Sequence, residues 1–407
     1  MDAIAKLGLI ADAMQFEPDG ETKPLPASSE TVPPCGLPLP VCDPTSQGLT
    51  ARPRKEDSLP IVNAAMPGGR RISLLKTLQT SACERDCYYC CFRAGRDSRR
   101  TTLSPDEMAQ AFIKLNQAGA VEGLFLSSGI AGGGIRTQDR IIATAETLRF
   151  KVGFKGYLHL KIMPGAEFGQ VERTMQLANR VSVNLEAPNT ARLVKLAPHK
   201  VFMEELLTPL KWIDAIRRSQ PASQTWNGRW PSTTTQFVVG AAGESDLELM
   251  TTTAALNQQV HLSRAYFSGF NPIQGTPLEN LPPNNPWREH RLYQASFLLR
   301  DYGFDLEELP FAGDGNLPLG TDPKLAWARD NLSEAPIEIN RAEWKELLRI
   351  PGVGPKTAQA ILAARRVNKI RGLNDLRRLG IPVDKAAPFL LLDGHRTPLQ
   401  LSLIADF

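Results

Sequence analysis

Strand-like and helical segments alternate along the middle of this 407-residue chain, and this alternation constrains the fold more than any other feature. Helical patterns separate the strand-like runs. The clearest begins at Ser104, with Pro105 at its first turn and Glu107 at the capping-box position. Strand–helix units in series predict an α/β fold whose parallel sheet curls into a partial (β/α)6 barrel. The six apolar runs lie at residues 71–80, 123–128, 156–162, 180–186, 233–240 and 262–268.

Four of the six cysteines lie within nine positions directly after the first predicted strand. Cys83, Cys87 and Cys90 form a C-x3-C-x2-C pattern, and Cys91 follows at once. Reactive groups in such barrels collect at the carboxyl ends of the strands, so we expect these thiols at the barrel mouth. Structural zinc prefers four ligands in two separated pairs. Three thiolates on one loop suit a 4Fe-4S cluster with one iron left open. A zinc site with Cys91 as fourth ligand, or inert thiols, is the alternative.

The cysteine triad, with Tyr89 before its last member, resembles the signature of the radical S-adenosylmethionine superfamily. The resemblance implies that a 4Fe-4S cluster binds Cys83, Cys87 and Cys90, and that S-adenosyl-L-methionine binds the open iron beside Tyr89. In that superfamily one electron from the cluster cleaves the sulfonium and yields a 5′-deoxyadenosyl radical. A one-electron donor such as flavodoxin or ferredoxin is then required.

Two strand ends carry polar groups that suit this cofactor. Ser127, Ser128 and Gly129 stand where the superfamily carries a Gly-rich motif that contacts the methionyl amine. Asn184 and Glu186 alternate with apolar residues, so we expect both on one face of the fourth strand. Ribose hydroxyls or the cofactor amine would satisfy them there; the alternative is a buried hydrogen-bonded pair.

The last two strands add further candidates. The segment after residue 239 resembles the superfamily's Gly-rich adenine motif, with Gly240, Gly243 and Glu244 matching, and "GFNPIQGTPLE" resembles the proline-rich end of its sixth strand. Lys161 and Arg264, on the third and sixth strands, are candidate catalytic residues. Each of them either binds a carboxylate or phosphate or forms an ion pair inside the barrel.

The C-terminal part of the chain is basic. Residues 341–407 contain 12 Lys and Arg against 6 Asp and Glu, although the whole chain has a net charge of only +4. "IPGVGPKTA" resembles a helix-hairpin-helix motif that grips a DNA phosphate without reading sequence. A looser second copy follows at residues 375–390. A hairpin used for protein contacts is the alternative. The predicted DNA-binding residues are Gly352, Val353, Gly354, Lys356 and Thr357.

Barrel and hairpin together resemble a subfamily of radical S-adenosylmethionine proteins associated with DNA modification or repair. The similarity covers roughly residues 61–400 and includes "RISLLKTLQTSACERDCYYC" and "KGYLHLKIMPGA". It implies a nucleic-acid substrate, with DNA favoured, and a partner resembling uracil-DNA glycosylase. A base inside a duplex is out of reach, so the substrate must be flipped out or single-stranded. The alternatives are modification of RNA such as tRNA, and a non-catalytic iron–sulfur adaptor that recruits a repair partner.

Composition shifts predict three regions. Residues 1–60 form an N-terminal helix and a Pro-rich arm, since residues 18–60 hold 10 of the 32 prolines. Residues 61–335 form the barrel, and residues 336–407 form the helix-hairpin-helix domain. Cys35 and Cys42 lie in the arm, where two thiols without nearby histidine only weakly indicate a second metal site.

The sequence predicts no membrane association. No apolar run reaches the roughly 18 residues that a membrane-spanning helix needs. The first sixteen residues lack a basic n-region and predict a short amphipathic helix. We therefore expect a cytoplasmic protein whose thiols stay reduced, which favours metal binding over disulfides.

Overall fold

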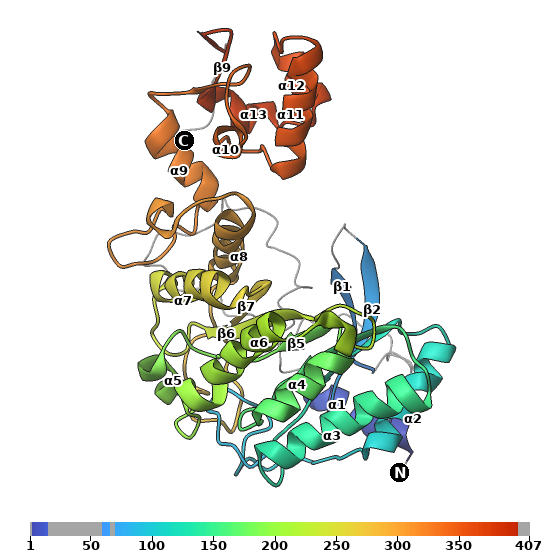
Figure 1. The fold of residues 1–407 in the computed structure, drawn as a ribbon. Coiled ribbons are helices and arrows are strands. Elements are labelled where there is room, and N and C mark those ends of the chain that lie inside the picture. Colours follow the sequence, from blue (N-terminus) through green and yellow to red (C-terminus); the bar gives the residue numbers. More distant parts are fainter. Residues whose placement is uncertain (1, 15–58, 66–69, 398–407) are drawn as a thin grey trace, which may run out of the picture. The chain divides into compact units, whose positions relative to one another are not determined.

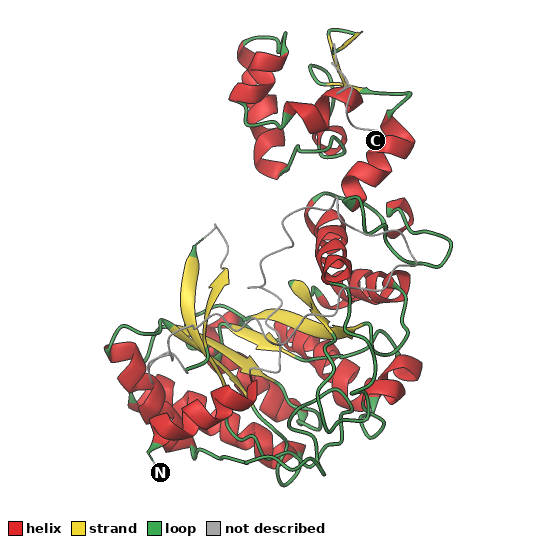
Figure 2. Ribbon diagram, turned by 180° about the vertical axis from the view of Figure 1, so that it is seen from behind, coloured by secondary structure: helices red, strands yellow, loops and turns green. Residues whose placement is uncertain are grey.

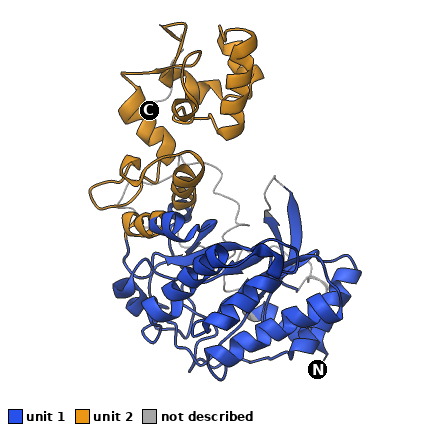
Figure 3. Cartoon of the chain, viewed as in Figure 1, with its two compact units in different colours: residues 1–27, 31–244, 255–289 blue, residues 28–30, 245–254, 290–407 orange. Residues whose placement is uncertain are grey.

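A computed structural model of the chain describes residues 2–14, 59–65 and 70–397. These residues form two compact units (Figure 3). The first contains residues 2–14, 59–65, 70–244 and 255–289, and the second contains residues 245–254 and 290–397. Cys35 and Cys42 lie outside the described residues. None of the helices in the described part of the chain is long and apolar enough to cross a membrane.

A seven-stranded sheet organises the first unit, and its strands follow one another in chain order (Figure 1). The first strand pairs antiparallel with the second, and every later pair is parallel. The predicted α/β fold with a partly closed parallel barrel is confirmed. The first strand is an edge strand that the sequence analysis did not predict. The strands are β1 (Ile61–Ala65), β2 (Arg71–Leu78), β3 (Gly123–Ser127), β4 (Tyr157–Lys161), β5 (Arg180–Ser182), β6 (Ser232–Val239) and β7 (Arg264–Gly269).

Helices occupy the connections between successive parallel strands (Figure 2). The α2 helix starts as predicted, because Ser104 Oγ accepts the Glu107 N–H at 3.2 Å and the Glu107 carboxylate accepts the Ser104 N–H at 2.8 Å. The predicted N-terminal helix is confirmed as α1. The helices are α1 (Ala3–Met14), α2 (Pro105–Gln117), α3 (Gly134–Glu146), α4 (Phe168–Leu177), α5 (Thr190–Leu196), α6 (Thr208–Ser219), α7 (Asp246–Val260) and α8 (Pro286–Asp301), with π-helical turns η4 (Thr147–Lys151) and η5 (Phe202–Leu207).

The two faces of the sheet have opposite character. Alternate residues of each strand point to opposite faces, and the strand register places one apolar set side by side. That set is fully buried and forms the main core, which gains roughly 1.5–3 kcal/mol for each large side chain removed from water. Its members include Leu75, Leu124, Leu126, Leu158, Leu160, Val181, Phe237 and Phe267.

The other set is mostly polar, and we call it the inner face. A closed barrel fills its interior with packed apolar side chains, whereas this partial barrel leaves a polar surface on its open side. Many of these side chains are only partly buried. The inner face includes Lys76, Phe125, Ser127, His159, Lys161, Arg180, Ser182, Thr234, Gln236, Arg264 and Tyr266, and the apolar Leu74, Leu78 and Val238 share it.

The fourth predicted strand is shorter than expected. β5 ends at Ser182, and Glu186 has a φ of 65° and makes a single bridge to Phe237. The prediction that Asn184 and Glu186 alternate along one regular strand is therefore wrong. The regular strand ends before both residues. The left-handed backbone at Glu186 also prevents the strand from continuing through that residue.

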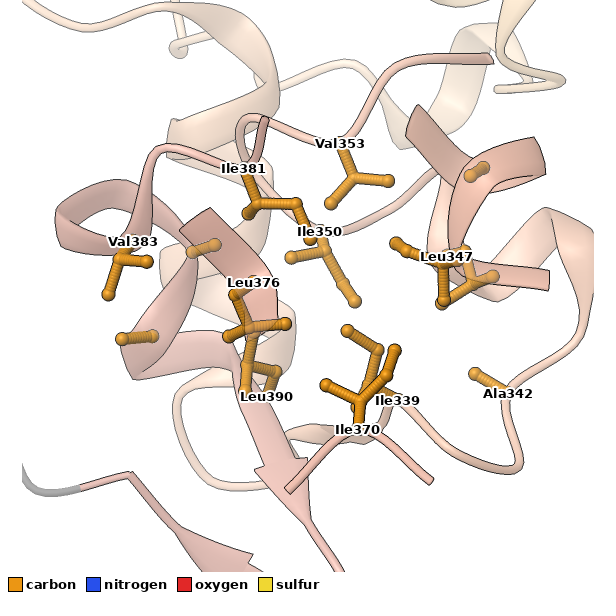
Figure 4. Close-up of a cluster of buried hydrophobic side chains, with 14 of the residues drawn as sticks. Ile339, Ala342, Leu347, Ile350, Val353, Ile370, Leu376, Ile381, Val383 and Leu390 are labelled. Carbon is orange, nitrogen blue, oxygen red and sulfur yellow. The ribbon is translucent and has the colours of Figure 1, made fainter. Parts of the chain in front are cut away.

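From α9 (Pro323–Leu332) onward the second unit is built mainly of short helices, with one large apolar cluster (Figure 4) and a smaller one of Ala328, Leu332 and Phe389. A three-stranded sheet accompanies the helices, so the region is not purely helical as predicted; strands of two or three residues carry no periodic sequence signal. The helices are α9 (Pro323–Leu332), α10 (Trp344–Leu347), α11 (Pro355–Val367), α12 (Leu373–Arg378) and α13 (Val383–Ala386). The strands are β8 (Ile337–Glu338), β9 (Leu390–Leu392) and β10 (His395–Arg396).

Candidate active site and candidate nucleic-acid interface

The loop that follows β2 carries the cysteine triad and is held in shape by one guanidinium group. Arg100 donates to the backbone carbonyls of Ser81 and Phe92 at 2.9 Å each. It also donates to the carbonyls of Arg93 and Arg96, at 2.9 and 3.2 Å. Four carbonyls on one side chain fix the loop on which the cysteines sit. The sequence analysis did not single out Arg100, since its partners become neighbours only when the loop closes.

The three thiols of the triad share one neighbourhood. Burial raises the pKa of Cys87 to about 11; Lys200 opposes this, while Cys90, Glu186 and Cys83 add to it. Backbone N–H groups reach two of the sulfurs: Ile130 donates to Cys83 Sγ and Phe92 to Cys90 Sγ, each at 3.4 Å. Such contacts to sulfur tune iron–sulfur centres.

These residues suit an iron–sulfur cluster in donor type and position. Each thiolate of a cubane binds a different iron, so the donors surround the cluster rather than one ion. Within the described ranges, no group of three or more Cys, His, Asp and Glu side chains is arranged to hold a single metal ion. Two features favour a cluster: the three thiol donors, and the electrostatic influence of these thiols on one another. Cys91 follows the triad but is buried, with 1% of its surface exposed.

A buried ion pair lies against the triad. Lys200 Nζ donates to Glu186 Oε1 at 3.2 Å and to the Tyr89 hydroxyl at 3.4 Å. Burial acts to raise the pKa of Glu186, but Lys200 and Lys161 outweigh it and hold the pKa below its usual value. Burial likewise acts to lower the pKa of Lys200, and the charges of Cys87 and Glu186 reverse the shift and raise it. Both groups are therefore charged near neutral pH.

Glu186 has one further property that points to a ligand. Its second carboxylate oxygen, Oε2, is buried and has no hydrogen-bond partner among the described residues. A buried ionised oxygen without a partner is costly, and an ammonium group or a hydroxyl would satisfy it. The amine and ribose hydroxyls of S-adenosyl-L-methionine are groups of this kind. Asn184 is partly exposed, two residues before Glu186.

The end of β3 packs directly against the cysteine loop. The Gly129 N–H donates to the Thr80 carbonyl at 2.7 Å, and a Cβ at Gly129 would lie 2.3 Å from the Ala82 carbonyl oxygen. Only glycine allows this approach. Ser127 and Ser128 precede it and are mostly buried. The three predicted residues at this strand end are thus brought beside the cysteine loop.

The Gly-rich segment after β6 forms a self-contained turn. The Glu244 carboxylate accepts the Gly240 N–H at 2.5 Å and the Ala242 N–H at 3.1 Å, and lies 3.4 Å from Arg288 Nη1. Gly240 and Gly243 both have positive φ, at 95° and 69°. Glu244 is therefore occupied in shaping the loop. We interpret it as a positioning residue, not as a group that contacts a ligand.

The predicted hairpin of the second unit is formed between α10 and α11. Gly352 has a φ of 80°, and a Cβ there would lie 2.4 Å from Pro382 Cγ. Gly354 directly precedes α11. Lys356 is exposed and Thr357 is partly buried in the first turn of α11. The turn therefore presents backbone and one cation at a helix N-terminus.

Val353 differs from the other predicted DNA-binding residues. Its side chain is fully buried and points into the core with Ile350 and Ile381 (Figure 4). Only its backbone is available at the turn, and its carbonyl accepts a hydrogen bond from Lys324 Nζ at 2.6 Å. Burial lowers the pKa of Lys324 to about 7; Arg349 adds to the shift and Asp322 opposes it.

A second helix–turn–helix follows in the same core. The helices α12 and α13 flank a turn in which Gly380 has a φ of 76°. Leu376 and Ile381 from this copy pack in the cluster that buries Val353 (Figure 4). The two turns also meet directly, since Pro382 limits the space at Gly352.

Comparison with known proteins identifies the C-terminal motif and aligns the barrel. Residues 333–390 match the helix-hairpin-helix motif family. A search of curated proteins returned no match. Methylornithine synthase aligns over 56% of this chain and 61% of its own length, with 14% identity and a TM-score of 0.44.

Two further solved structures also align with this chain. The FeFe-hydrogenase maturase from Carboxydothermus hydrogenoformans aligns over 56% of this chain and 51% of its own, with 14% identity and a TM-score of 0.44. A radical S-adenosylmethionine methyltransferase from Kitasatospora setae aligns over 51% and 38%, with 13% identity and a TM-score of 0.37. The chain thus spans less than two thirds of each of these proteins. The fold class rests on the strand order described above.

The buried ion pair generates a stability prediction. Glu186→Ala leaves the Lys200 ammonium buried without a counter-charge and should lower the free energy of unfolding by about 3–5 kcal/mol. The double variant Glu186→Gln/Lys200→Met removes both charges and should cost clearly less. Denaturant unfolding of the metal-free protein measures both.

The exposed pair Arg173–Glu146 is the matched control. Glu146→Ala removes a solvent-screened partner, so the loss there should stay below about 1 kcal/mol. A Glu186→Ala variant no less stable than Glu146→Ala would contradict the interpretation of the buried pair.

Lys324 generates a pH-dependent prediction. Its pKa is about 7 in the folded protein and about 10.5 ordinarily. Between these values the unfolded chain binds a proton that the folded chain does not, so this group makes stability rise with pH. The slope is at most about 1.4 kcal/mol per pH unit.

The measurement is the difference in unfolding free energy between the parent protein and Lys324→Met, from about pH 7 to about pH 10. The parent should gain stability relative to the variant as the pH rises. A difference that does not change with pH would show that Lys324 is charged in the folded state.

Proposed function

We propose that this chain is a radical S-adenosylmethionine enzyme that acts on nucleic acid. The observation that carries the proposal is the mutual influence of the three thiols beside the buried pair of Glu186 and Lys200. This group lies where the chain leaves β2 and β5, at the carboxyl ends of parallel strands. The helix-hairpin-helix match supports the nucleic-acid part of the proposal.

In this proposal Cys83, Cys87 and Cys90 would hold a 4Fe-4S cluster. When bound, the cluster would supply the single electron needed to cleave the sulfonium of S-adenosyl-L-methionine. Lys200 offsets the negative charge of the thiolates, since its charge already acts on Cys87. Arg100 keeps the loop closed through its four carbonyl contacts.

Other residues of the strand ends receive the organic cofactor. Glu186 offers its unpaired Oε2 to the amine or to a ribose hydroxyl. Ser127, Ser128 and Gly129 supply short polar groups and backbone beside the cysteine loop. Gly240 and Gly243 supply backbone without side chains for the adenine, in a turn that Glu244 holds. Asn184 and Tyr89 complete the set.

The regional organisation follows the same proposal. We assign residues 61–335 to the barrel and residues 336–407 to nucleic-acid binding, with an N-terminal arm before them. A reducing compartment such as the cytoplasm suits the free thiols. Flavodoxin or ferredoxin as electron donor, and a partner resembling uracil-DNA glycosylase, belong to the proposal as well.

The test of the radical reaction is anaerobic reconstitution with iron and sulfide, followed by addition of S-adenosyl-L-methionine and dithionite. We expect 5′-deoxyadenosine from the parent protein, and more of it when DNA is present. Cys83→Ala, Cys87→Ala and Cys90→Ala should lose the cluster, and with it the product. Cys91→Ala is the matched control and should retain both. A fully loaded cluster that yields no 5′-deoxyadenosine would favour the adaptor function.

The nucleic-acid part is tested by the salt dependence of binding. Lys356→Ala should weaken duplex binding about equally for all sequences and reduce the slope of log affinity against log salt by about 1. Lys345→Ala, which removes an exposed charge from α10, is the control and should leave the slope unchanged. Competition between DNA and tRNA then separates the two substrate classes. Absence of binding to either would reject this part of the proposal.

A further inference from the structure

The inner face of the sheet carries a one-sided charge. The six parallel-paired strands β2 to β7 contain no Asp or Glu at all. Their inner-face positions include four basic residues: Lys76, Lys161, Arg180 and Arg264. The strands thus contribute basic groups and no carboxylate to this surface, and clustered positive charge attracts anions.

Three of these cations surround one histidine. His159 stacks on Phe125 with 4.1 Å between ring centroids and 9° between ring planes. Burial lowers the pKa of His159 well below its usual value, and Arg180, Lys161 and Lys76 lower it further. The four groups therefore lie close enough to act on one another, although they come from three different strands.

Arg180 and His159 form hydrogen bonds to neutral partners. Arg180 donates to the Tyr266 hydroxyl at 3.1 Å and to Ser232 Oγ at 3.2 Å. His159 Nε2 shares a hydrogen bond with Ser182 Oγ at 2.9 Å. Across the described parts of the chain, neither Lys161 nor Arg180 forms an ion pair. Neither side chain is therefore held by a carboxylate at ion-pair distance, although Lys161 acts on Glu186 over a longer range.

A buried hydroxyl marks the same surface. Thr234 is paired in register with Ser182 on one side and Arg264 on the other, so it shares the inner face. Its side chain is 1% exposed, and its Oγ1 has no hydrogen-bond partner among the described residues. A ligand oxygen would complete its hydrogen bonding.

We propose that the inner face binds a phosphate ester of the substrate through Lys161 and Arg180, with Lys76, His159 and Thr234 beside them. A phosphate oxygen array accepts several cations at once, and the planar guanidinium of Arg180 matches it. This inference rests on the proposed function, because it identifies a phosphate-bearing nucleotide as the part of the substrate that enters the barrel.

The site and the cysteine loop lie at the same edge of the sheet. Lys161 is the last residue of β4, and the cysteine loop follows the end of β2, which runs in the same direction. A nucleotide held by Lys161 would therefore lie near the thiols. Its phosphate would fix the position of the sugar and base, because a contact remote from the reacting atoms can orient them.

The test is equilibrium binding to the full-length protein without cluster or S-adenosyl-L-methionine. The two probes are a nucleoside 5′-monophosphate and a short single-stranded oligodeoxynucleotide. Lys161→Gln and Arg180→Gln should each weaken binding about tenfold, as expected for loss of a charged hydrogen bond. Lys155→Gln removes an exposed charge shortly before β4 and should have no effect.

Lysine modification followed by mass spectrometry locates the site independently of affinity. The probe should protect Lys161 but not Lys155. Lys161→Arg keeps the charge and should restore binding, which separates lost contact from lost folding. Weakening with both probes, or with the oligonucleotide alone, supports a nucleic-acid strand as substrate, and weakening with the monophosphate alone supports a free nucleotide.

Unchanged binding in Lys161→Gln and Arg180→Gln, with no protection of Lys161, would overturn the inference. The readout needs neither cluster nor reaction, so the two proposals fail separately. If the parent protein forms 5′-deoxyadenosine but the inner-face variants bind normally, only the inner-face site is rejected. If the variants bind weakly but no product forms, only the radical reaction is rejected.

Discussion

The pairing of Glu186 with Lys200 is the interaction on which the candidate active site depends. Both groups are nearly buried, with 6% and 9% of their side-chain surface exposed. Neither charge would persist alone in such surroundings, because desolvation favours the neutral form of each. Together they bring one fixed anion and one fixed cation to the cysteine loop. The thiols, Tyr89 and the inner-face Lys161 all act on this pair.

In the second unit, the hairpin turn between α10 and α11 exposes backbone while the apolar core beneath it stays packed. Val353 does both, since its side chain fills the core while its peptide forms the turn. The Lys324 ammonium donates a hydrogen bond to the Val353 carbonyl. Pro382 from the second copy of the motif fills the space that a side chain at residue 352 would need. A turn held on three sides loses little conformational entropy when it binds, which favours contact with a phosphate backbone.

Local signals allowed most of the fold to be predicted. The capping box at Ser104, the strand–helix alternation and the hairpin glycines each depend on residues within a few positions of one another. The missed features depend on closure of the chain. Arg100 gains its four carbonyls only once the loop folds, and Lys200 lies 14 residues beyond its partner Glu186, with no periodicity to connect them.

One face of the open sheet provides hydrophobic stabilisation, and the other, the inner face, carries the proposed ligand site. The opposite face, packed under the helices, holds fully buried leucine, valine and phenylalanine side chains and provides the hydrophobic stabilisation. That leaves the inner face free to carry like charges, whose mutual repulsion would destabilise a closed barrel interior. Repulsion between neighbouring cations lowers the stability of the folded state, and an anion bound there would offset that loss. If the inner face binds a phosphate as proposed, a carboxylate on strands β2 to β7 would neutralise part of the charge that attracts it.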